Sequence, residues 1–326
     1  MLSKIKIVPL AAESFGVRSM CTYVETSDVK VLLDAGVSLA PNRHGFPPHP
    51  KEYKAMHKCR EKISKAANEA EVVTISHYHF DHHTPSYVDW CYNWSSPDVA
   101  KGIYEGKLVL VKSFRSMINF SQRRRGWLFQ KTGGSHAEKL QIADGKTFGF
   151  GDTTLKFSDP VFHGPENSEL GWLLMATIEC CGEKVLFASD VQGPMYNPTL
   201  KTILAEKPHL VIVGGPPIYL AGFRVRDEHV QQGMSNLGRL VENVPTTILE
   251  HHILRDEGWR ELSQSIFDAA SKAGHSVVTA AEFLGEKNNV LEFRRKYLFE
   301  VEPPDPEFEG WMKLQNPKRK LIKPPI

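Results

Sequence analysis

The sequence VVTISHYHFDHHTP, residues 72–85, places four histidines and one aspartate within the seven residues from His77 to His83. The segment before it, residues 71–76, is rich in apolar and β-branched residues, which predicts a buried strand. His77 and His79 are two residues apart, so at a strand end their side chains would point to the same face. Imidazole nitrogen and carboxylate oxygen are ligands that zinc accepts. The stretch therefore predicts a metal site directly after a buried strand.

Composition places the chain among soluble globular proteins. It has 326 residues, of which 41% are hydrophobic and 24% charged, and a formal net charge of +2. This balance does not mark a nucleic-acid-binding or membrane-surface protein. The five cysteines show no CxxC spacing, which favours a reducing cytoplasm over a disulfide framework. We find no signal peptide and no apolar run long enough to span a membrane, so we expect a cytoplasmic protein that binds no membrane.

Strand-like segments come early, and strands alternate with helices later in the chain. This order predicts an α+β fold in which two sheets lie inside and helices lie outside. The strand-like segments are residues 4–10, 21–26, 29–36, 71–76, 107–113, 154–162, 171–180, 184–190, 209–215 and 246–252. The helical segments are residues 49–70, 198–206, 225–242 and 258–273.

The segment SHYHFDHH resembles the His-x-His-x-Asp-His signature of the metallo-β-lactamase superfamily of hydrolases. Three later strand ends are similar to that superfamily in order and rough spacing: LKFSDPVFHGPE with His163, KVLFASDVQGP with Asp190, and TTILEHHILRD with His251 and His252. Within the superfamily, the chain looks most like a mainly archaeal group of predicted metallo-hydrolases. The resemblance implies an αββα four-layer sandwich. We expect it to form a single domain over residues 1–299, followed by a Pro-rich charged tail, residues 300–326.

The resemblance also implies a site for two divalent metal ions, with zinc expected and manganese or iron as alternatives. Of the last two histidines, His251 is favoured because HHILRD is similar to a His-x-x-x-Arg pattern of tRNA 3′-processing members. A continuing strand would send the two rings to opposite faces, so we expect only one of them to bind. His252 is the alternative. Asp81 and Asp190 are also the implied catalytic residues, with Asp190 bridging the ions. The implied ligands are His77, His79 and His163 for one ion, and Asp81, His82 and His251 for the other.

The implied reaction is hydrolysis by hydroxide that a dinuclear metal centre activates. The segment 113–134 carries Arg123, Arg124 and Arg125 among aromatic residues, which suits phosphate and base recognition, although a solvated basic helix face would look the same. Tyr219, in the Gly/Pro-rich loop 214–222, is a further candidate for substrate binding. We therefore expect a phosphodiester, RNA or DNA substrate. The alternatives are a hydrolase of a small carboxylic ester, lactone or thioester, and a non-catalytic metal-binding partner protein.

Overall fold

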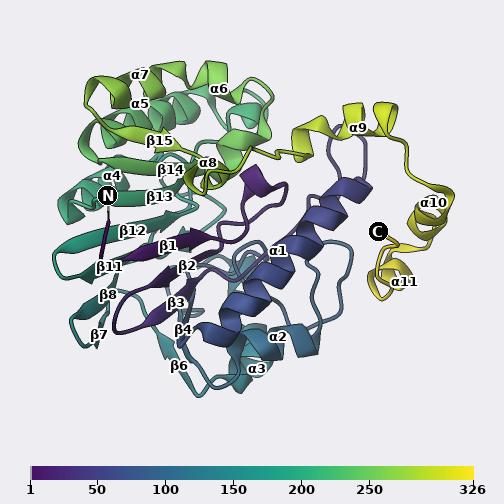
Figure 1. Ribbon diagram of the computed structural model, residues 1–326, viewed down its shortest axis with the longest axis horizontal. Coiled ribbons are helices and arrows are strands. Elements are labelled where there is room, and N and C mark those ends of the chain that lie inside the picture. The colour runs from purple at the N-terminus through teal and green to yellow at the C-terminus, as the bar shows by residue number, and fades with distance from the viewer. Residues whose placement is uncertain (1) are drawn as a thin grey trace.

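The computed structural model describes residues 2–326 and has two β-sheets packed face to face between layers of helices (Figure 1). One group of helices covers the outer face of the first sheet, and a second group covers the outer face of the second. The predicted αββα four-layer sandwich is confirmed.

The first sheet has six strands in sequence order, of which the last four are parallel. Its strands are β1 (Lys6–Pro9), β2 (Thr22–Glu25), β3 (Lys30–Leu33), β4 (Val72–Ile75), β5 (Leu108–Val111) and β6 (Lys139–Ile142). Strands β1 to β3 form an antiparallel meander, and β3 to β6 run parallel. All four residues of β4 are buried, as expected for a parallel strand that is covered on both faces.

The second sheet has seven strands in the order β15-β14-β13-β12-β11-β8-β7. The parallel half contains β12 (Glu183–Ser189), β13 (Leu210–Gly214), β14 (Thr246–Glu250) and β15 (Ser276–Val278). The antiparallel half contains β7 (Thr147–Phe150), β8 (Thr153–Phe157) and β11 (Ala176–Cys180). A small hairpin pairs β9 (Val161–Phe162) with β10 (Trp172–Leu173). The segments 154–162 and 171–180, each expected as one strand, are thus divided, the first around Pro160, which cannot donate a ladder hydrogen bond.

The three helices on the first sheet begin at residues whose side chains accept from the first backbone N–H groups. On the first sheet lie α1 (Pro50–Glu69), α2 (Pro97–Tyr104) and α3 (Phe120–Lys131). Outside the second lie α4 (Asn197–Glu206), α5 (Asp227–Asn243), α6 (Trp259–Leu262) and α7 (Gln264–Lys272). The short α8 (Ala280–Phe283) follows β15, and its Ala280 and Ala281 belong to the cluster on the inner face of that sheet. His49 and Glu52 form a capping box at the start of α1, and Asn119 caps α3. The helix expected over residues 258–273 is interrupted at Ser263 and forms α6 and α7.

Two hydrophobic clusters use the two faces of the second sheet. In β12, Val185 and Phe187 belong to the cluster that fills the space between the sheets. Their neighbours Leu186 and Ala188 belong to the cluster under the outer helices, with Leu240 of α5. This alternation follows from the two-residue period of a strand. It fixes the register of β12 and therefore the position of the residue that follows it, Asp190.

The C-terminal segment forms three short helices, α9 (Arg295–Val301), α10 (Pro306–Met312) and α11 (Asn316–Lys320). In Figure 1, α10 and α11 lie at the right, beyond α1. Phe308 and Trp311 are buried against Tyr53 of α1, with ring centroids 5.7 and 5.3 Å from that ring. The Lys320 carbonyl accepts a hydrogen bond from the Trp90 amide at 3.0 Å. The boundary expected at residue 299 falls inside α9, and the division into domain and tail stays a prediction.

Candidate metal centre

The carboxyl ends of the parallel strands carry the chemically distinctive residues. Asp34 follows β3, His77 follows β4, Asp190 follows β12 and His251 follows β14. In open α/β sheets, the crevice beyond the carboxyl ends of the strands is the usual place for a ligand. Here the two sheets bring their ends together, because the Oγ atoms of Ser76 and Ser189 lie 2.9 Å apart across the sheets.

The first predicted ligand group converges in space. Ligand atoms of His77, His79 and His163 all lie within 4.8 Å of one another. His77 Nε2 is 3.1 Å from His79 Nδ1, and the His163 ring centroid is 5.0 Å from those of both other rings. His77 and His163 are almost completely buried. Three imidazoles facing one point form a donor set that suits a divalent metal ion.

The second predicted group also converges, beside the first. Ligand atoms of Asp81, His82 and His251 lie within 4.8 Å of one another. The Oδ2 atom of Asp190 lies between the groups, 3.1 Å from His163 Nε2 and 3.1 Å from His251 Nε2. One carboxylate oxygen thus touches a histidine of each group, the placement expected of a bridging ligand.

His251 and His252 face the same carboxylate. Strand β14 ends at Glu250, and His251–Arg255 form the 3₁₀-helix η4, so the expected alternation to opposite faces does not apply. His252 Nε2 is 3.2 Å from Asp190 Oδ2, as close as His251 within a tenth of an ångström. The two rings differ in their other contacts. The Nδ1 atom of His252 lies 3.0 Å from the Arg255 guanidinium, whereas that of His251 lies 3.1 Å from the Glu13 carboxylate.

These contacts distinguish the two histidines chemically. A carboxylate only accepts hydrogen bonds, so the Glu13 contact keeps a proton on His251 Nδ1 and leaves Nε2, which faces Asp190 and Asp81, as the atom through which this ring can bind a metal. A guanidinium only donates, so His252 accepts at Nδ1 and carries its proton on Nε2. Arg255 also approaches His251 Nδ1, at 3.2 Å, but it binds Glu13 more closely through Nε at 2.8 Å. The proton held on Nδ1 by Glu13 favours His251 over His252 as the histidine that faces the metal through Nε2.

Glu13 was not among the candidates from the sequence. It lies in the short 3₁₀-helix η1 (Glu13–Phe15), is buried, and pairs with both Arg255 and His251. A lone glutamate 238 residues from its partner gives no signal in the sequence. Asp34 was also given no role, although it ends the LLD segment after β3. Its Oδ2 accepts from His82 Nδ1 at 2.8 Å and from Ser189 Oγ at 3.1 Å, which leaves His82 Nε2 directed into the second group.

Close backbone approach and left-handed conformations hold the site together. A Cβ atom at Gly36 would lie 2.4 Å from the backbone nitrogens of His82 and His83, so only glycine fits there. Asp34, Ser189 and His251 have φ values of 47°, 54° and 68°, in the region that non-glycine residues seldom adopt. Such residues often cluster at functional sites, where the surrounding structure holds them.

At the imidazoles of His77 and His79 and the carboxylates of Asp81 and Asp190, the local environment favours the protonation states that metal ligands need. Burial, with the neighbouring imidazoles, lowers the pKa of His77 and His79 well below the ordinary value. Burial would raise the pKa of Asp81 and Asp190, but the surrounding histidines outweigh it and lower both. Burial opposes a charge on His251, yet Glu13 and Asp190 raise its pKa to about 10, which shows a strongly negative potential at that ring. Neutral imidazoles and ionised carboxylates are the forms that bind metals.

Three ligand-type atoms remain without a hydrogen bond among residues 2–326. They are His82 Nε2, His163 Nε2 and Asp190 Oδ1, and all three are buried. Leaving such atoms unpaired is costly, and buried polar groups in native proteins seldom lack a partner. A divalent cation would satisfy them, so the residues present fit a divalent metal site.

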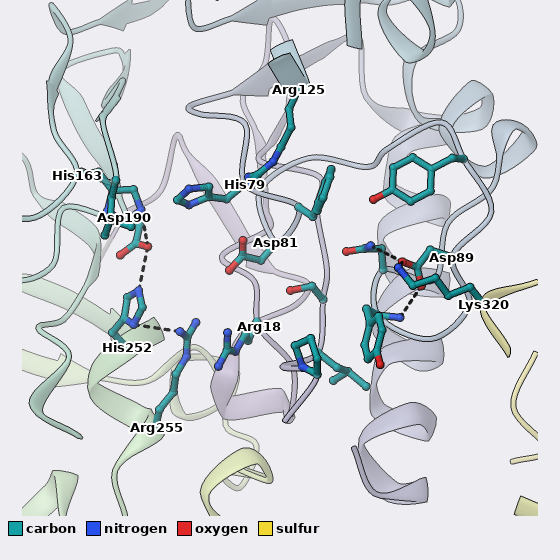
Figure 2. Close-up of a pocket in the computed structure, with 18 residues that line it drawn as sticks. Arg18, His79, Asp81, Asp89, Arg125, His163, Asp190, His252, Arg255 and Lys320 are labelled. Atoms are coloured by element: carbon teal, nitrogen blue, oxygen red, sulfur yellow. Dashed lines mark hydrogen bonds and ion pairs between the residues drawn. The ribbon is translucent and has the colours of Figure 1, made fainter. Parts of the chain in front are cut away.

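A cavity of about 390 Å³ opens over these groups (Figure 2). His79, Asp81, His163 and Asp190 lie toward one end, and the ion pair of Asp89 with Lys320 lies toward the other. The basic residues lining the cavity are Arg18, Arg125, Arg255 and Lys320. Among these, Arg18 pairs with Glu292, Arg255 with Glu13 and Lys320 with Asp89. Arg125 instead donates to the Tyr78 carbonyl and the Ser121 hydroxyl, so its charge is not neutralised by a carboxylate among residues 2–326.

The other sequence candidates occupy different places. Arg125 lines the cavity, whereas Arg123 and Arg124 are exposed and face a second hollow on α3. Tyr219 contacts the rim, with its hydroxyl 3.3 Å from His252 Nδ1, and its ring packs on Arg43. The structure therefore separates the three arginines. Their role in substrate binding stays a prediction.

Three polar residues next to the candidate ligands, His83, Glu250 and Asp256, make hydrogen bonds with the backbone. His83 is buried and its Nδ1 donates to the His79 carbonyl at 2.9 Å. Glu250 accepts from the backbone amides of Ser14 and Ala280, and Asp256 accepts from the Gly258 amide. All three fix the backbone around the site, while Glu13 and Asp34 hold the rings.

Comparison with known proteins places the chain in a family. No family model matches it. UPF0282 protein MK0213 of Methanopyrus kandleri is 42% identical over 294 residues, which cover 90% of this chain and 99% of that protein. UPF0282 protein MJ1629 of Methanocaldococcus jannaschii is 41% identical over 293 residues, which cover 90% of this chain and 96% of that protein.

Among the described residues, none of the helices has the length and apolar character needed to cross a membrane.

Solved structures show only distant likeness. The short form of human tRNase Z has a TM-score of 0.43 and 12% identity, with 75% of this chain and 91% of that chain covered. CmlA, a diiron β-hydroxylase from Streptomyces venezuelae, has a TM-score of 0.49 and 14% identity, covering 86% of this chain; the match spans about half of that enzyme, 53%. The fold is of the metallo-β-lactamase type, and by its sequence the chain belongs to the UPF0282 family.

Proposed function

We propose that this protein is a hydrolase that uses two divalent metal ions, with zinc expected, to cleave a phosphodiester in a small molecule or a nucleic acid. The observation that carries the proposal is the pair of converging ligand groups, joined by Asp190 and open to a cavity that Arg125 lines. The proposed ligands are His77, His79, Asp81, His82, His163, Asp190 and His251.

The chain prepares these ligands through hydrogen bonds to their far sides. Asp34 accepts from His82 Nδ1 and Glu13 accepts from His251 Nδ1, so both rings would bind a metal through Nε2. When bound, the two ions would lower the pKa of a water and polarise the scissile group. Asp81 faces the cavity in its ionised form, and its carboxylate is suited to accept a hydrogen bond from the attacking water.

The cavity favours an anionic substrate. Arg125 presents a guanidinium whose charge no carboxylate neutralises among residues 2–326, and guanidinium groups bind phosphate oxygens well. Its side chain packs over the Phe80 ring at 4.9 Å, which holds it at the cavity wall. Arg18 and Arg255 add positive potential, although each is paired with a glutamate. These contacts support a phosphodiester over a neutral ester.

Metal content tests the centre. We expect close to two ions per wild-type chain by elemental analysis, fewer in Asp190→Ala and His251→Ala, and little change in His252→Ala. His57→Ala is a matched control, because His57 lies on α1 with its side chain 44% exposed. Equal metal content in wild type and Asp190→Ala would reject the bridging role.

Turnover tests the reaction. Wild-type protein loaded with zinc or manganese should hydrolyse bis-p-nitrophenyl phosphate, and Asp190→Ala should not. Hydrolysis of p-nitrophenyl acetate without phosphodiesterase activity would transfer the assignment to a carboxylic ester, lactone or thioester. Two bound ions without turnover of either substrate would favour the non-catalytic metal-binding protein.

A further inference from the structure

Helix α3 carries an exposed surface that the metal centre does not use. A hollow of about 430 Å³ is lined by Phe114, Arg115, Phe120, Arg123, Arg124 and Trp127, which we call the α3 hollow. Phe120 is 81% exposed and Trp127 is 53% exposed. Large aromatic side chains gathered on a surface are a common sign of a binding site, whereas single exposed ones are ordinary.

The charge of the α3 hollow points to an anionic ligand. Arg115, Arg123 and Arg124 make no ion pair with a carboxylate of residues 2–326, unlike Arg18, Arg255 and Arg295 elsewhere in the protein. The Arg115 guanidinium lies over the Phe114 ring at 5.2 Å, so it is held beside the aromatic surface. Unpaired guanidinium groups that alternate with exposed aromatic rings match the phosphates and bases of a single strand.

The α3 hollow is rigidly connected to the metal centre. Gly126 faces inward, where a Cβ atom would lie 2.6 Å from the Tyr78 ring, so the helix packs directly on the residue between His77 and His79. Gln122 accepts from the Tyr78 amide at 3.1 Å and donates to the Leu170 carbonyl at 2.6 Å. Leu170 lines the cavity over the metal centre. A ligand on α3 is therefore held at a fixed position relative to that cavity.

The same helix reaches both sites. Arg125 points into the metal cavity (Figure 2), and its two preceding neighbours line the α3 hollow. A single-stranded nucleic acid bound in the α3 hollow would place a phosphate near Arg125 without any conformational change of the protein. We propose that the α3 hollow binds single-stranded nucleic acid, with bases stacked on Phe120 and Trp127 and phosphates on Arg123 and Arg124. That the bound strand is a substrate of the metal centre rests on the proposed function. Whether the α3 hollow binds nucleic acid can be measured independently of any cleavage.

Fluorescence anisotropy of a labelled, unstructured poly-U strand tests it in the Asp190→Ala background, where no cleavage is expected. Stacking on one base contributes enough that Phe120→Ala with Trp127→Ala should weaken binding about tenfold or more, with little change in salt dependence. Arg123→Gln with Arg124→Gln should weaken binding and reduce the slope of log K against log salt by about 1.4, since each phosphate contributes about 0.7 on a single strand.

The matched control is Lys58→Gln with Lys65→Gln, which removes two exposed charges from α1. Equal losses in the control and in the arginine variant would overturn the inference, because the binding would then be diffuse. Binding of poly-glutamate but not poly-U would also overturn it, in favour of an acidic peptide. Circular dichroism verifies that each variant is folded. Bis-p-nitrophenyl phosphate turnover by wild type is measured separately, so the failure of the hollow and the failure of the hydrolase give different results.

Discussion

Two runs of neighbouring basic side chains, the loop from His77 to His83 and the helix turn from Arg123 to Arg125, are used in opposite ways. In the loop, side chains that are adjacent in sequence converge on one place, because the chain turns directly after β4. In the helix, adjacent side chains point about 100° apart, so Arg125 enters the metal cavity and its two neighbours face the α3 hollow. In this protein the compact motif that forms a single site is the one at which the backbone leaves regular structure.

The largest effect should come from breaking the loop's support at Gly36. Gly36→Ala places a Cβ atom 2.4 Å from the backbone nitrogens of His82 and His83, so the loop must shift. We expect a loss of about 1–3 kcal/mol in unfolding free energy, or more if the backbone cannot adjust. Metal content should fall with it. Calorimetry and elemental analysis measure the two effects.

Gly102→Ala is the matched control for that substitution. Gly102 lies in α2, and nothing lies within 4 Å of the Cβ atom that alanine would add. Alanine is the better helix former, so we expect a stabilisation of about 0.5–1 kcal/mol and unchanged metal content. Unchanged unfolding free energy and metal content in Gly36→Ala would show that the loop tolerates movement. The loop would then be no more tightly constrained than a helix surface.

Acid should affect the histidine loop and leave the arginines unchanged. Burial lowers the pKa of His77 and His79, and lowers that of His83 to about 4. In metal-free protein, the unfolded chain therefore binds more protons than the folded one as the pH falls below about 6.5. Unfolding free energy should decrease between about pH 6.5 and 4, by up to about 1.4 kcal/mol per pH unit for each such group.

Urea titrations of chelator-treated protein measure this dependence. His251 has the opposite shift, with its pKa raised to about 10, so it is protonated in both states below about pH 6.5 and adds no slope there. His83→Gln should remove about one proton's share of the slope. A flat profile in wild-type protein would mean that these imidazoles are not buried as described.

The smallest effect should come from Arg125. Arg125→Gln removes the cavity's guanidinium that is free of a carboxylate partner among residues 2–326, and we expect the KM for bis-p-nitrophenyl phosphate to rise roughly tenfold, as for one charged hydrogen bond. The dependence of this KM on salt concentration should also decrease in the variant. Arg226→Gln, which removes an exposed charge just before α5, is the control. An equal KM in wild type and Arg125→Gln would show that Arg125, and with it α3, does not contact the substrate at the metal centre.

Much of the fold and of the candidate site could be predicted from patterns of short range. The His-x-His-x-Asp-His segment after β4 resembles the metallo-β-lactamase signature, which implied the sandwich, and the residues it proposed as ligands lie together in the structure. Asp190 and His251 were proposed for the same reason, since each follows a strand-like segment, and their role as ligands stays a prediction. The break within residues 171–180 was missed because apolar residues continue through it. The breaks near Pro160 and at Ser263 fall on polar residues, a signal that the prediction of one continuous strand and one continuous helix did not use.

Sequence alone determined which residue types gather at the strand ends, because burial of a parallel strand imposes an apolar run that stops where the ligands begin. Tertiary structure decided which side chains form hydrogen bonds to these candidate ligands and fix their orientation. The pairing of Glu13 with His251 joins residues 238 apart, and Asp34 meets His82 across 48. It also decided that His251 and His252 share one face and that three successive arginines divide between two sites. Those outcomes depend on hydrogen bonds and packing between distant segments, which no local pattern encodes.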